Sequence, residues 1–249
     1  MTDTESVPVA CDETQEPKQE PGHMESRVAK PKNKKCTDAL LPKAIEVERK
    51  FVVTDDCKEK LLELGAELFK TSEFTDEYFD VEQYTLTTHD FWLRTRGGKF
   101  ELKSPVVKND LNTPSSQYHE LDDEAAILEK IAGVLGKDPG TMSLHEYLAE
   151  TKCSVFSCYT TKRLSYMLED FEIVLDEMDF GFSIGEIERM VDSESKISEA
   201  LVAIDSMAEK LGLIGRKKVP GKMRAYLKIK RPEHYRALVE CDGMVESNA

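Results

Sequence analysis

Residues 44–53 constrain the fold most, because charged and apolar side chains alternate along this stretch. Side chains alternate between the two faces of a β-strand, so Glu46, Glu48 and Lys50 would share one face. Apolar residues such as Val47 would lie on the opposite face. Two carboxylates and an ammonium group in a row are suited to hold a hard cation and one end of an anionic substrate. For one strand alone, a charged face in contact with water is the simpler interpretation.

The same alternation recurs in later segments, and this recurrence favours a functional interpretation. Each segment has one charged face and one apolar face, so the apolar faces can form a core with surrounding helices. If the sheet closes into a barrel, the charged faces line a polar tunnel. The acidic set would comprise Glu46, Glu48, Glu120, Asp176, Glu186 and Glu188, and the basic set Lys50, Arg94, Arg96, Lys103, Arg163 and Lys222.

A tunnel with so many charges calls for ligands, since buried charges are costly unless they pair or bind ions. A multivalent anion together with divalent cations would satisfy both sets. Triphosphate with Mg²⁺ or Mn²⁺ fits this pattern, because arginine and lysine bind phosphate oxygens and carboxylates bind the metal.

The remaining pattern predicts an α+β fold, in which an antiparallel sheet or barrel has helices packed outside it. Strands are predicted at 44–53, 74–79, 90–96, 99–104, 117–121, 155–164, 165–170, 171–177, 183–190 and 222–229. Helices are predicted at 55–64, 122–135, 143–150, 195–211 and 232–240. In the last predicted strand, Lys222, Arg224, Tyr226 and Lys228 would share one face.

Composition argues against several classes of function. The 249 residues carry a formal net charge of −14, which disfavours a broad nucleic-acid-binding surface. The six cysteines show no C-x-x-C spacing, which indicates free thiols in a reducing compartment. The sequence has no signal-peptide pattern and no apolar run of membrane-spanning length. We therefore expect a soluble, cytoplasmic monomer that binds neither nucleic acid nor membranes.

Residues 1–43 are predicted to form a disordered tail, because they are rich in Glu, Pro, Lys and Ser and poor in large apolar residues. The folded domain would span residues 44–240, and residues 241–249 would form a flexible end. The basic run at 30–35 is interpreted as part of a solvated linker rather than as a localisation signal.

Over about residues 44–240, the sequence resembles the CYTH superfamily, the triphosphate tunnel metalloenzymes. The resemblance rests first on the E-x-E-x-K motif formed by Glu46, Glu48 and Lys50. Supporting segments follow in the order and spacing of the family, at 76–80, 92–96, 100–103, 161–163, 179–181, 185–188 and 231–235. Within the superfamily, the sequence resembles the animal thiamine triphosphatases most.

The resemblance implies an antiparallel barrel of eight strands with helices outside, in agreement with the alternation. It implies that triphosphate binds to Lys50, Arg94, Arg96, Lys103, Arg163 and Lys222. It also implies that Mg²⁺, or Mn²⁺, binds to Glu46, Glu48, Asp176, Glu186 and Glu188. Mammalian thiamine triphosphatases carry two alternating acidic residues on the strand of Asp176, and Val174 takes the earlier position here.

The implied function is metal-dependent hydrolysis of thiamine triphosphate to thiamine diphosphate and phosphate. Glu46, Glu48 and Lys50 would take part in catalysis, and either a second metal or a carboxylate such as Glu46 or Glu188 would activate water. Trp92 would either stack on a thiamine ring or pack at the tunnel mouth. An inorganic tripolyphosphatase is the nearest alternative. A non-catalytic polyphosphate-binding module is a further one, which the metal-type carboxylates disfavour.

Overall fold

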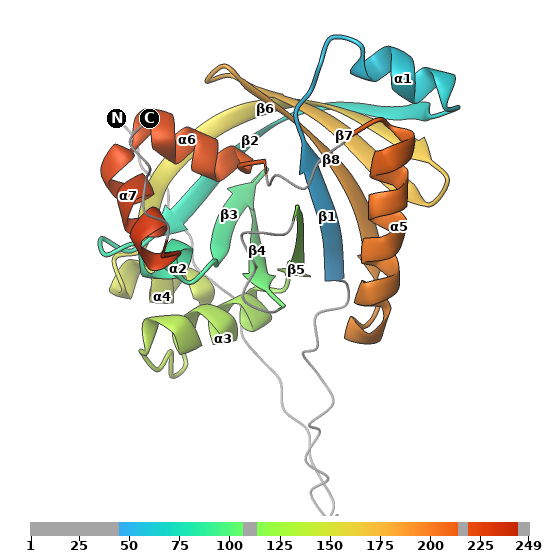
Figure 1. Ribbon diagram of the computed structural model, residues 1–249. Coiled ribbons are helices and arrows are strands. Elements are labelled where there is room, and N and C mark those ends of the chain that lie inside the picture. Colours follow the sequence, from blue (N-terminus) through green and yellow to red (C-terminus); the bar gives the residue numbers. More distant parts are fainter. Residues whose placement is uncertain (1–44, 107–113, 214–218, 244–249) are drawn as a thin grey trace, which may run out of the picture. The chain divides into compact units, whose positions relative to one another are not determined.

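The computed structural model describes residues 45–106, 114–213 and 219–243. Its strands form a closed antiparallel barrel in the order β1-β5-β4-β3-β2-β6-β7-β8 (Figure 1). They are β1 (Ile45–Phe51), β2 (Glu67–Asp80), β3 (Trp92–Arg96), β4 (Lys99–Pro105), β5 (Ser115–Leu121), β6 (Ser154–Leu168), β7 (Phe171–Met178) and β8 (Phe182–Val191). The prediction of an eight-stranded antiparallel barrel is confirmed.

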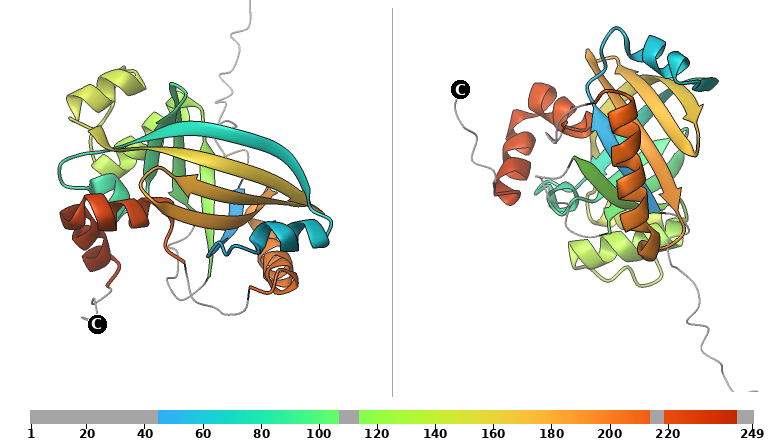
Figure 2. Two further views of the ribbon diagram at one scale, coloured as in Figure 1. Left: turned by 90° about the horizontal axis from the view of Figure 1, so that it is seen from above. Right: turned by 45° about the vertical axis from the view of Figure 1, so that its right-hand side comes forward.

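The helices lie outside the barrel, and Figure 2 shows α5 and the α6–α7 pair on different sides of it. The helices are α1 (Cys57–Glu63), α2 (Thr85–Thr88), α3 (Glu124–Leu135), α4 (Leu144–Glu150), α5 (Ile197–Lys210), α6 (Lys222–Lys230) and α7 (Pro232–Cys241). Local signals explain their ends, since Ser143 and Glu146 form a capping box at the start of α4. Among the described residues, every helix is too short or too polar to cross a membrane.

Strand register decides which side chains enter the barrel. β1 pairs with β5 on one side and with β8 on the other, so the barrel closes without an open edge at this strand. Glu48 lies opposite Ser116 on β5 and opposite Glu188 on β8. A shift by one residue would exchange the inner and outer faces, so the apolar outer face fixes the charged inner one.

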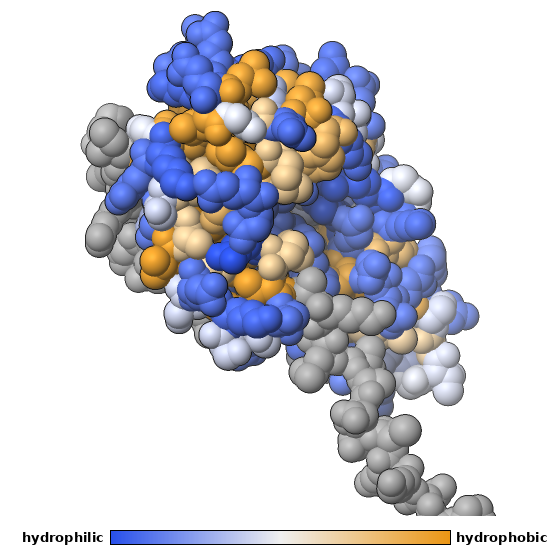
Figure 3. Space-filling model, turned by 90° about the vertical axis from the view of Figure 1, so that its right-hand side faces the viewer, coloured by the Kyte–Doolittle hydropathy of each residue, from blue (hydrophilic) through white to orange (hydrophobic). Residues whose placement is uncertain are grey.

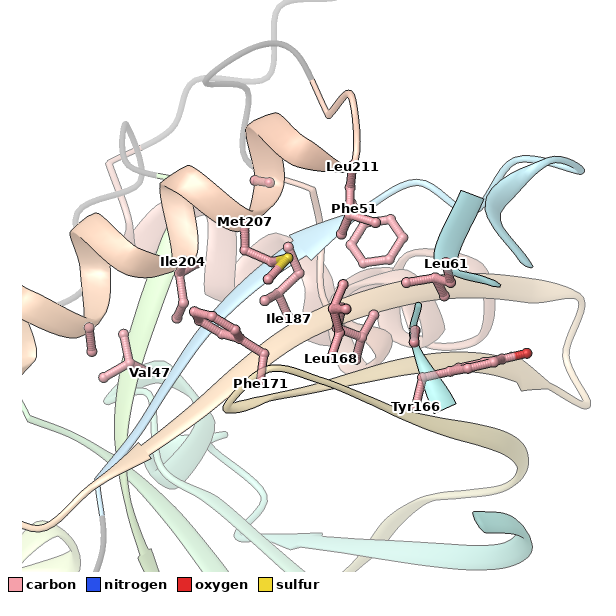
Figure 4. Packing of buried hydrophobic residues seen from close by; sticks show 14 of the residues in the cluster. Val47, Phe51, Leu61, Tyr166, Leu168, Phe171, Ile187, Ile204, Met207 and Leu211 are labelled. Carbon is pink, nitrogen blue, oxygen red and sulfur yellow. The ribbon is translucent and has the colours of Figure 1, made fainter. Parts of the chain in front are cut away.

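The outer face of β1 packs under α5. Val47 and Phe51 of β1 form one apolar cluster with Ile187 of β8 and with Ile204 and Met207 of α5 (Figure 4). Helix α5 carries its apolar residues at helical spacing along one side, which the barrel covers. Burial of the outer face therefore leaves the charged alternate residues directed inwards.

Two further apolar clusters hold the other helices. Beneath α3 and α4, Leu93 and Leu102 pack against Ile127 and Tyr147. The third cluster lies at one end of the tunnel, where Met223, Leu227 and Leu238 of α6 and α7 meet Tyr78 and Tyr159 of the barrel.

Some apolar side chains stay exposed, and Figure 3 shows them grouped near the top of one side of the molecule. Exposed apolar residues of α1 and of the beginning of β2 include Leu62, Leu68 and Phe69. None of these three lines the large cavity described below.

The prediction of a strand at 222–229 is wrong, because this segment forms α6. Gly221 precedes the helix, and the buried residues Met223 and Leu227 lie four positions apart, on one helical face. The pairing of β1 with β8 also closes the barrel, which leaves no edge for another strand. In a polar segment this short, the spacing of charged and apolar residues is compatible both with the two-residue period of a strand and with the 3.6-residue period of a helix.

Two other predicted boundaries are wrong. The segments 155–164 and 165–170 form one strand, β6, and β2 begins at Glu67 rather than at residue 74. β2 and β6 pair along most of their length, so polar residues in the first half of β2 gain strand structure from their partner. The short helix α2 had not been predicted.

The predicted disordered tail, residues 1–43, lies outside the described residues. So do residues 244–249 of the predicted flexible end, whereas Cys241 is the last residue of α7.

Candidate active site

The inner face of β1 brings the E-x-E-x-K residues into the barrel. Glu46 and Glu48 are 4% and 2% exposed, and each carboxylate has a lysine partner. Lys103 of β4 binds Glu46, while Lys50 binds Glu48. The ammonium of Lys103 also lies 3.7 Å from Glu48 and 3.2 Å from Glu120. Lysines from β1 and β4 therefore lie among carboxylates from β1 and β5.

Two of the predicted phosphate-binding arginines form two-pronged pairs with buried carboxylates. Arg96 donates from Nε and Nη2 to the two oxygens of Asp76, at 2.7 and 2.8 Å. Arg163 donates in the same way to Asp176, at 2.7 Å for both bonds. Such forked pairs fix the guanidinium plane, so the remaining N–H groups point in set directions.

Arg94 lies between these pairs and the cavity mouth. Its guanidinium binds Glu101 at 2.7 Å and lies 3.8 Å from Asp76. Nη1 also donates to the hydroxyl of Tyr78 at 3.4 Å. Arg94 and Arg96 therefore meet at Asp76, which joins the two arginines of β3.

Lys222 reaches the tunnel from α6 rather than from a strand. Its ammonium lies 2.7 Å from Asp176 and 2.7 Å from Glu186. The preceding Gly221 lies against Lys50, since a Cβ there would be 3.2 Å from the Lys50 Cε. The sequence thus predicted Lys222 on a strand, whereas the structure places this residue at the start of helix α6.

The carboxylates of β8 have contrasting environments. Burial opposes ionisation of Glu186, but Lys222, Lys50 and Arg163 outweigh it and hold the pKa of this carboxyl well below its usual range. Burial, with the nearby charges of Glu46 and Glu186, raises the pKa of Glu188 well above its usual range. Adjacent positions on one inner face therefore favour opposite protonation states.

The same contrast holds on β1. Burial raises the pKa of Glu46 to about 7 despite Lys103, and the charges of Glu48 and Glu120 add to the rise. Burial acts against Glu48 too, yet Lys50 and Lys103 lower the pKa of this carboxyl.

This group of carboxylates suits a divalent cation in its donor chemistry. Glu46 and Glu48 of β1 neighbour Glu186 and Glu188 of β8, and the raised pKa values of Glu46 and Glu188 arise partly from mutual repulsion. A cation of hard character would relieve that repulsion through oxygen ligands. Within the described residues, no three such side chains converge closely enough to hold a metal ion, and lysines pair with several of the carboxylates.

Val174 takes its predicted place on the inner face of β7. It is fully buried and lies opposite Glu186 in the ladder, two residues before Asp176. Glu172, on the same face, lies opposite Glu188. The apolar side chain therefore stands between the two acidic positions of this strand.

The tunnel opens into a cavity of about 920 Å³. Its charged lining residues include Lys50, Arg94, Lys103, Lys222 and Arg224, with Glu48, Glu186 and Asp242. Aromatic, apolar and other polar residues also line it, among them His89, Asp90, Trp92, Tyr118, Pro220, Met223 and Tyr235. Trp92 thus shares the cavity with these charged residues, and its indole N–H donates to Asp90 at 2.8 Å.

The sequence reading did not assign a site role to several residues that line or support the tunnel. Asp76 is 1% exposed and holds Arg96, while Tyr78 contacts Arg94. Both lie on the inner face of β2. Because they are two positions apart in a strand, the sequence could have predicted that they share one face. Their opposition to the two arginines of β3 depends on register, which the sequence did not reveal.

Comparison with known proteins agrees with this architecture. Residues 44–221 match the family model for the CYTH domain. Human thiamine-triphosphatase is 32% identical over 213 residues, which cover 81% of this chain and 92% of the human protein. The thiamine-triphosphatase of Macaca fascicularis is 32% identical over 210 residues, which cover 80% of this chain and 91% of that protein.

A solved archaeal structure shows the same fold at lower sequence identity. The PH1819 protein of Pyrococcus horikoshii superposes with a TM-score of 0.51 and 19% identity, over 74% of this chain and 99% of that one. The closed barrel, its charged inner face and the match over residues 44–221 lead to one conclusion: the chain belongs to the CYTH family.

Proposed function

We propose that this protein hydrolyses thiamine triphosphate to thiamine diphosphate and phosphate with the help of a divalent cation. The observation that carries the proposal is the cavity, whose lining combines basic and aromatic side chains. A substrate with a polyphosphate chain attached to a ring matches that combination. The similarity to two thiamine-triphosphatases over about four fifths of the chain supports the same substrate.

The basic residues would bind the phosphate chain. Lys50, Lys103, Lys222 and Arg94 line the cavity, and Arg96 and Arg163 lie on the inner face of the barrel, each paired with a buried aspartate. Each of these basic residues pairs with a carboxylate in the structure. Phosphate oxygens would therefore replace some of these carboxylate partners or bind beside them. Arginine and lysine would also offset the charge that develops on the leaving diphosphate.

Glu46, Glu48, Asp176, Glu186 and Glu188 would hold the divalent cation, Mg²⁺ or Mn²⁺. When bound, such an ion neutralises phosphate charge and polarises the phosphorus–oxygen bonds. The residue set fits this role because it is oxygen-rich and lies opposite the basic residues inside one barrel.

The chemical step would be attack of water on the terminal phosphorus, in line with the bridging oxygen. A new phosphorus–oxygen bond forms, the bridging bond breaks and thiamine diphosphate leaves. A carboxylate accepts the proton from water. Glu46 and Glu188 are the candidates, because both lie on the inner face beside other carboxylates and would ionise once a bound cation offset the repulsion that helps to raise their pKa values.

Phosphate release from thiamine triphosphate, tripolyphosphate and ATP, measured with Mg²⁺, with Mn²⁺ and with EDTA, tests the proposal. We expect the highest kcat/KM for thiamine triphosphate, loss of turnover with EDTA and recovery on addition of Mg²⁺. Turnover that persists without metal would refute the metal assignment. A higher kcat/KM for tripolyphosphate would favour the alternative function, for which the charged interior alone would suffice.

Substitution of Trp92 gives the most direct test between thiamine triphosphate and tripolyphosphate as the substrate. If its indole stacks on the thiamine ring, Trp92→Ala should lower kcat/KM for thiamine triphosphate. The expected loss of transition-state binding is about 1–2 kcal/mol, the size of a cation–π contact in a partly desolvated site. Tripolyphosphate has no ring, so its hydrolysis should change little. Equal losses on both substrates would show that Trp92 only supports the barrel.

A further inference from the structure

Thr161 carries a buried hydroxyl on the inner face of β6. Side chains two positions apart share one face of a strand, and Arg163 directs its guanidinium to Asp176 inside the barrel. Thr161 therefore points inwards as well, and it is fully buried. Among the described residues, its Oγ1 is one of three buried side-chain atoms without a hydrogen-bond partner, and the other two belong to histidine rings.

The carboxylates on either side of Thr161 have other partners. Asp76 of β2 and Asp176 of β7 each lie two positions from the residue that pairs with Thr161. Both oxygens of Asp76 accept from Arg96, and both oxygens of Asp176 accept from Arg163. Because arginines engage these two carboxylates, the hydroxyl stays available as a donor to a ligand.

The ring of Phe74 connects Thr161 to both arginines. Phe74 lies directly opposite Thr161 in the β2–β6 ladder, a placement that brings the two Cβ atoms to about 4.5–5.5 Å. The Cζ of Arg96 lies 3.8 Å from the centre of this ring, and the Cζ of Arg163 lies 5.6 Å from it. Three hydrogen-bond donors thus border one aromatic ring, a grouping suited to anionic oxygens.

The cavity adjoins this grouping through two of its lining residues. Arg94 lies 3.8 Å from Asp76, and Lys222 lies 2.7 Å from Asp176. A polyphosphate chain bound to Arg94 and Lys222 would therefore lie next to both forked pairs. The buried hydroxyl lies on the strand between those pairs.

We propose that Thr161 is a further substrate-binding residue, whose hydroxyl donates a hydrogen bond to a phosphate oxygen beside Arg163. The inference rests on the proposed function, since it needs a triphosphate inside the barrel. Burial of a hydroxyl without a partner costs folding free energy, and a bound phosphate supplies the missing acceptor. A hydrogen bond to a charged oxygen is also stronger than one between neutral groups. Thr161 therefore favours the complex over the free protein.

The test measures affinity and stability in variants that keep or lose this hydroxyl. Thr161→Val keeps the shape of the side chain but removes the hydroxyl, whereas Thr161→Ser keeps the hydroxyl. Thr160→Val is the matched control, because the neighbouring threonine lies on the outer face and its hydroxyl bonds that of Thr75 at 2.9 Å. The probe is a tripolyphosphate with NH groups in place of its bridging oxygens, which resists hydrolysis. Calorimetric titration with Mg²⁺ present would measure its affinity.

We expect Thr161→Val to bind the probe about ten- to a hundredfold more weakly than wild type, the range for one hydrogen bond to a charged group. Thr161→Ser and Thr160→Val should bind it nearly as well as wild type. In the free protein, Thr161→Val should keep or raise the melting temperature, because it removes a buried hydroxyl that has no partner. A structural role alone would instead lower the melting temperature and leave the affinity of the folded protein unchanged.

Unchanged affinity in Thr161→Val would overturn the proposal. So would equal losses in Thr161→Val and Thr161→Ser, since the hydroxyl would then make no difference. If valine prevented folding, Thr161→Ala and Thr161→Ser would give the same comparison, because they differ by one hydroxyl group. Failure of the proposed function gives a different result, namely wild-type protein that binds the probe but does not hydrolyse thiamine triphosphate. In that case the Thr161 variants still decide whether the hydroxyl binds phosphate.

Discussion

Two groups of buried polar side chains among the described residues differ in what satisfies them. In the tunnel, charged groups pair with charged groups, as in the two-pronged contact of Arg163 with Asp176. Near α7, the carboxylate of Asp80 instead accepts hydrogen bonds from neutral donors. These are the backbone N–H groups of Val81, Leu86 and Thr87 and the Thr87 hydroxyl, at 2.7 to 2.9 Å.

The second group, which we call the clamp cluster, consists of Asp80, Thr87 and His234. The Thr87 hydroxyl also lies 2.6 Å from Nε2 of His234, so the cluster connects the end of β2 through α2 to α7. The ring of Tyr84 stacks on that imidazole with centroids 3.9 Å apart. Three of the four donors to Asp80 are backbone N–H groups of residues 81–87, and none of them comes from the charged residues of the tunnel.

The comparison teaches how to distinguish polar groups that serve function from those that serve folding. Tunnel charges pair with one another through their side chains, so a ligand can take over their partners. The hydrogen bonds of the clamp cluster join β2, α2 and α7 without a charged partner. We therefore expect tunnel substitutions to change turnover and binding in folded protein, and clamp substitutions to change stability.

The largest effect should come from the inner face of β1. Glu48→Gln keeps the size of the side chain but removes a charge that we assign to metal binding. We expect kcat for thiamine triphosphate to fall by about two orders of magnitude or more. Glu59→Gln, an exposed change on α1, is the matched control. Normal turnover by the double variant Glu46→Gln/Glu48→Gln, with native circular dichroism, would rule out their catalytic role.

The next effect concerns the forked arginines. Arg163→Ala should weaken binding of a non-hydrolysed triphosphate analogue by about 1.5–3 kcal/mol, the range for hydrogen bonds to charged groups. Isothermal titration calorimetry would measure the affinity. Lys162→Ala is the control, because the neighbouring side chain is exposed on the outer face of the same strand. Equal affinities for both variants and wild type would refute the assignment of Arg163 to phosphate.

Much of the barrel could be predicted because one rule covers it. Alternation along β1 was enough to separate Glu46 and Glu48 from Val47, and the structure shows the charged residues inside and the apolar one under α5. The same rule failed at 222–229, where Lys222 and Tyr226 fit a strand of period two and a helix of period 3.6 equally well. Only the closed barrel decides between them.

The partners of the site residues could not be predicted, because they depend on register and on loops. Asp76 meets Arg96 only because β2 pairs with β3 in one particular alignment. Asp90 reaches Trp92 through a turn with left-handed backbone, which periodicity does not describe. Alternation predicts which face a residue occupies, whereas these contacts need the distance between chain segments.

In the clamp cluster, Asp80→Ala should cost stability rather than catalysis. The change leaves three backbone N–H groups without their acceptor, two of them in buried hydrogen bonds, a loss we set at about 3 kcal/mol from the cost of unsatisfied buried donors. For a domain of this size, the melting temperature should fall by roughly 6–12 °C. Glu82→Ala, a substitution of an exposed residue two positions away, should leave the melting temperature unchanged. A large drop in kcat per folded molecule, with an unchanged melting temperature, would contradict the comparison.

The smallest effect concerns the pH dependence of stability. Burial, and next the charge of Arg231, lower the pKa of His234 from its usual 6.5 to about 4. Between these values the unfolded chain binds a proton at this residue that the folded protein does not, so the free energy of unfolding should fall as the pH drops from 7 to 5. In His234→Gln this share of the pH dependence disappears, so the slope of melting temperature against pH should become less positive than in wild type.

Thr87→Ala separates titration from packing in this experiment. It removes the same hydrogen bond but keeps the imidazole, so it should lower the melting temperature at every pH while the slope stays close to that of wild type. Scanning calorimetry of the three proteins between pH 7.5 and 5 would measure both quantities. If His234→Gln and wild type showed parallel curves, the imidazole would not be held neutral by the fold. The clamp cluster would then resemble the tunnel, where charged forms persist in the interior because other charges surround them.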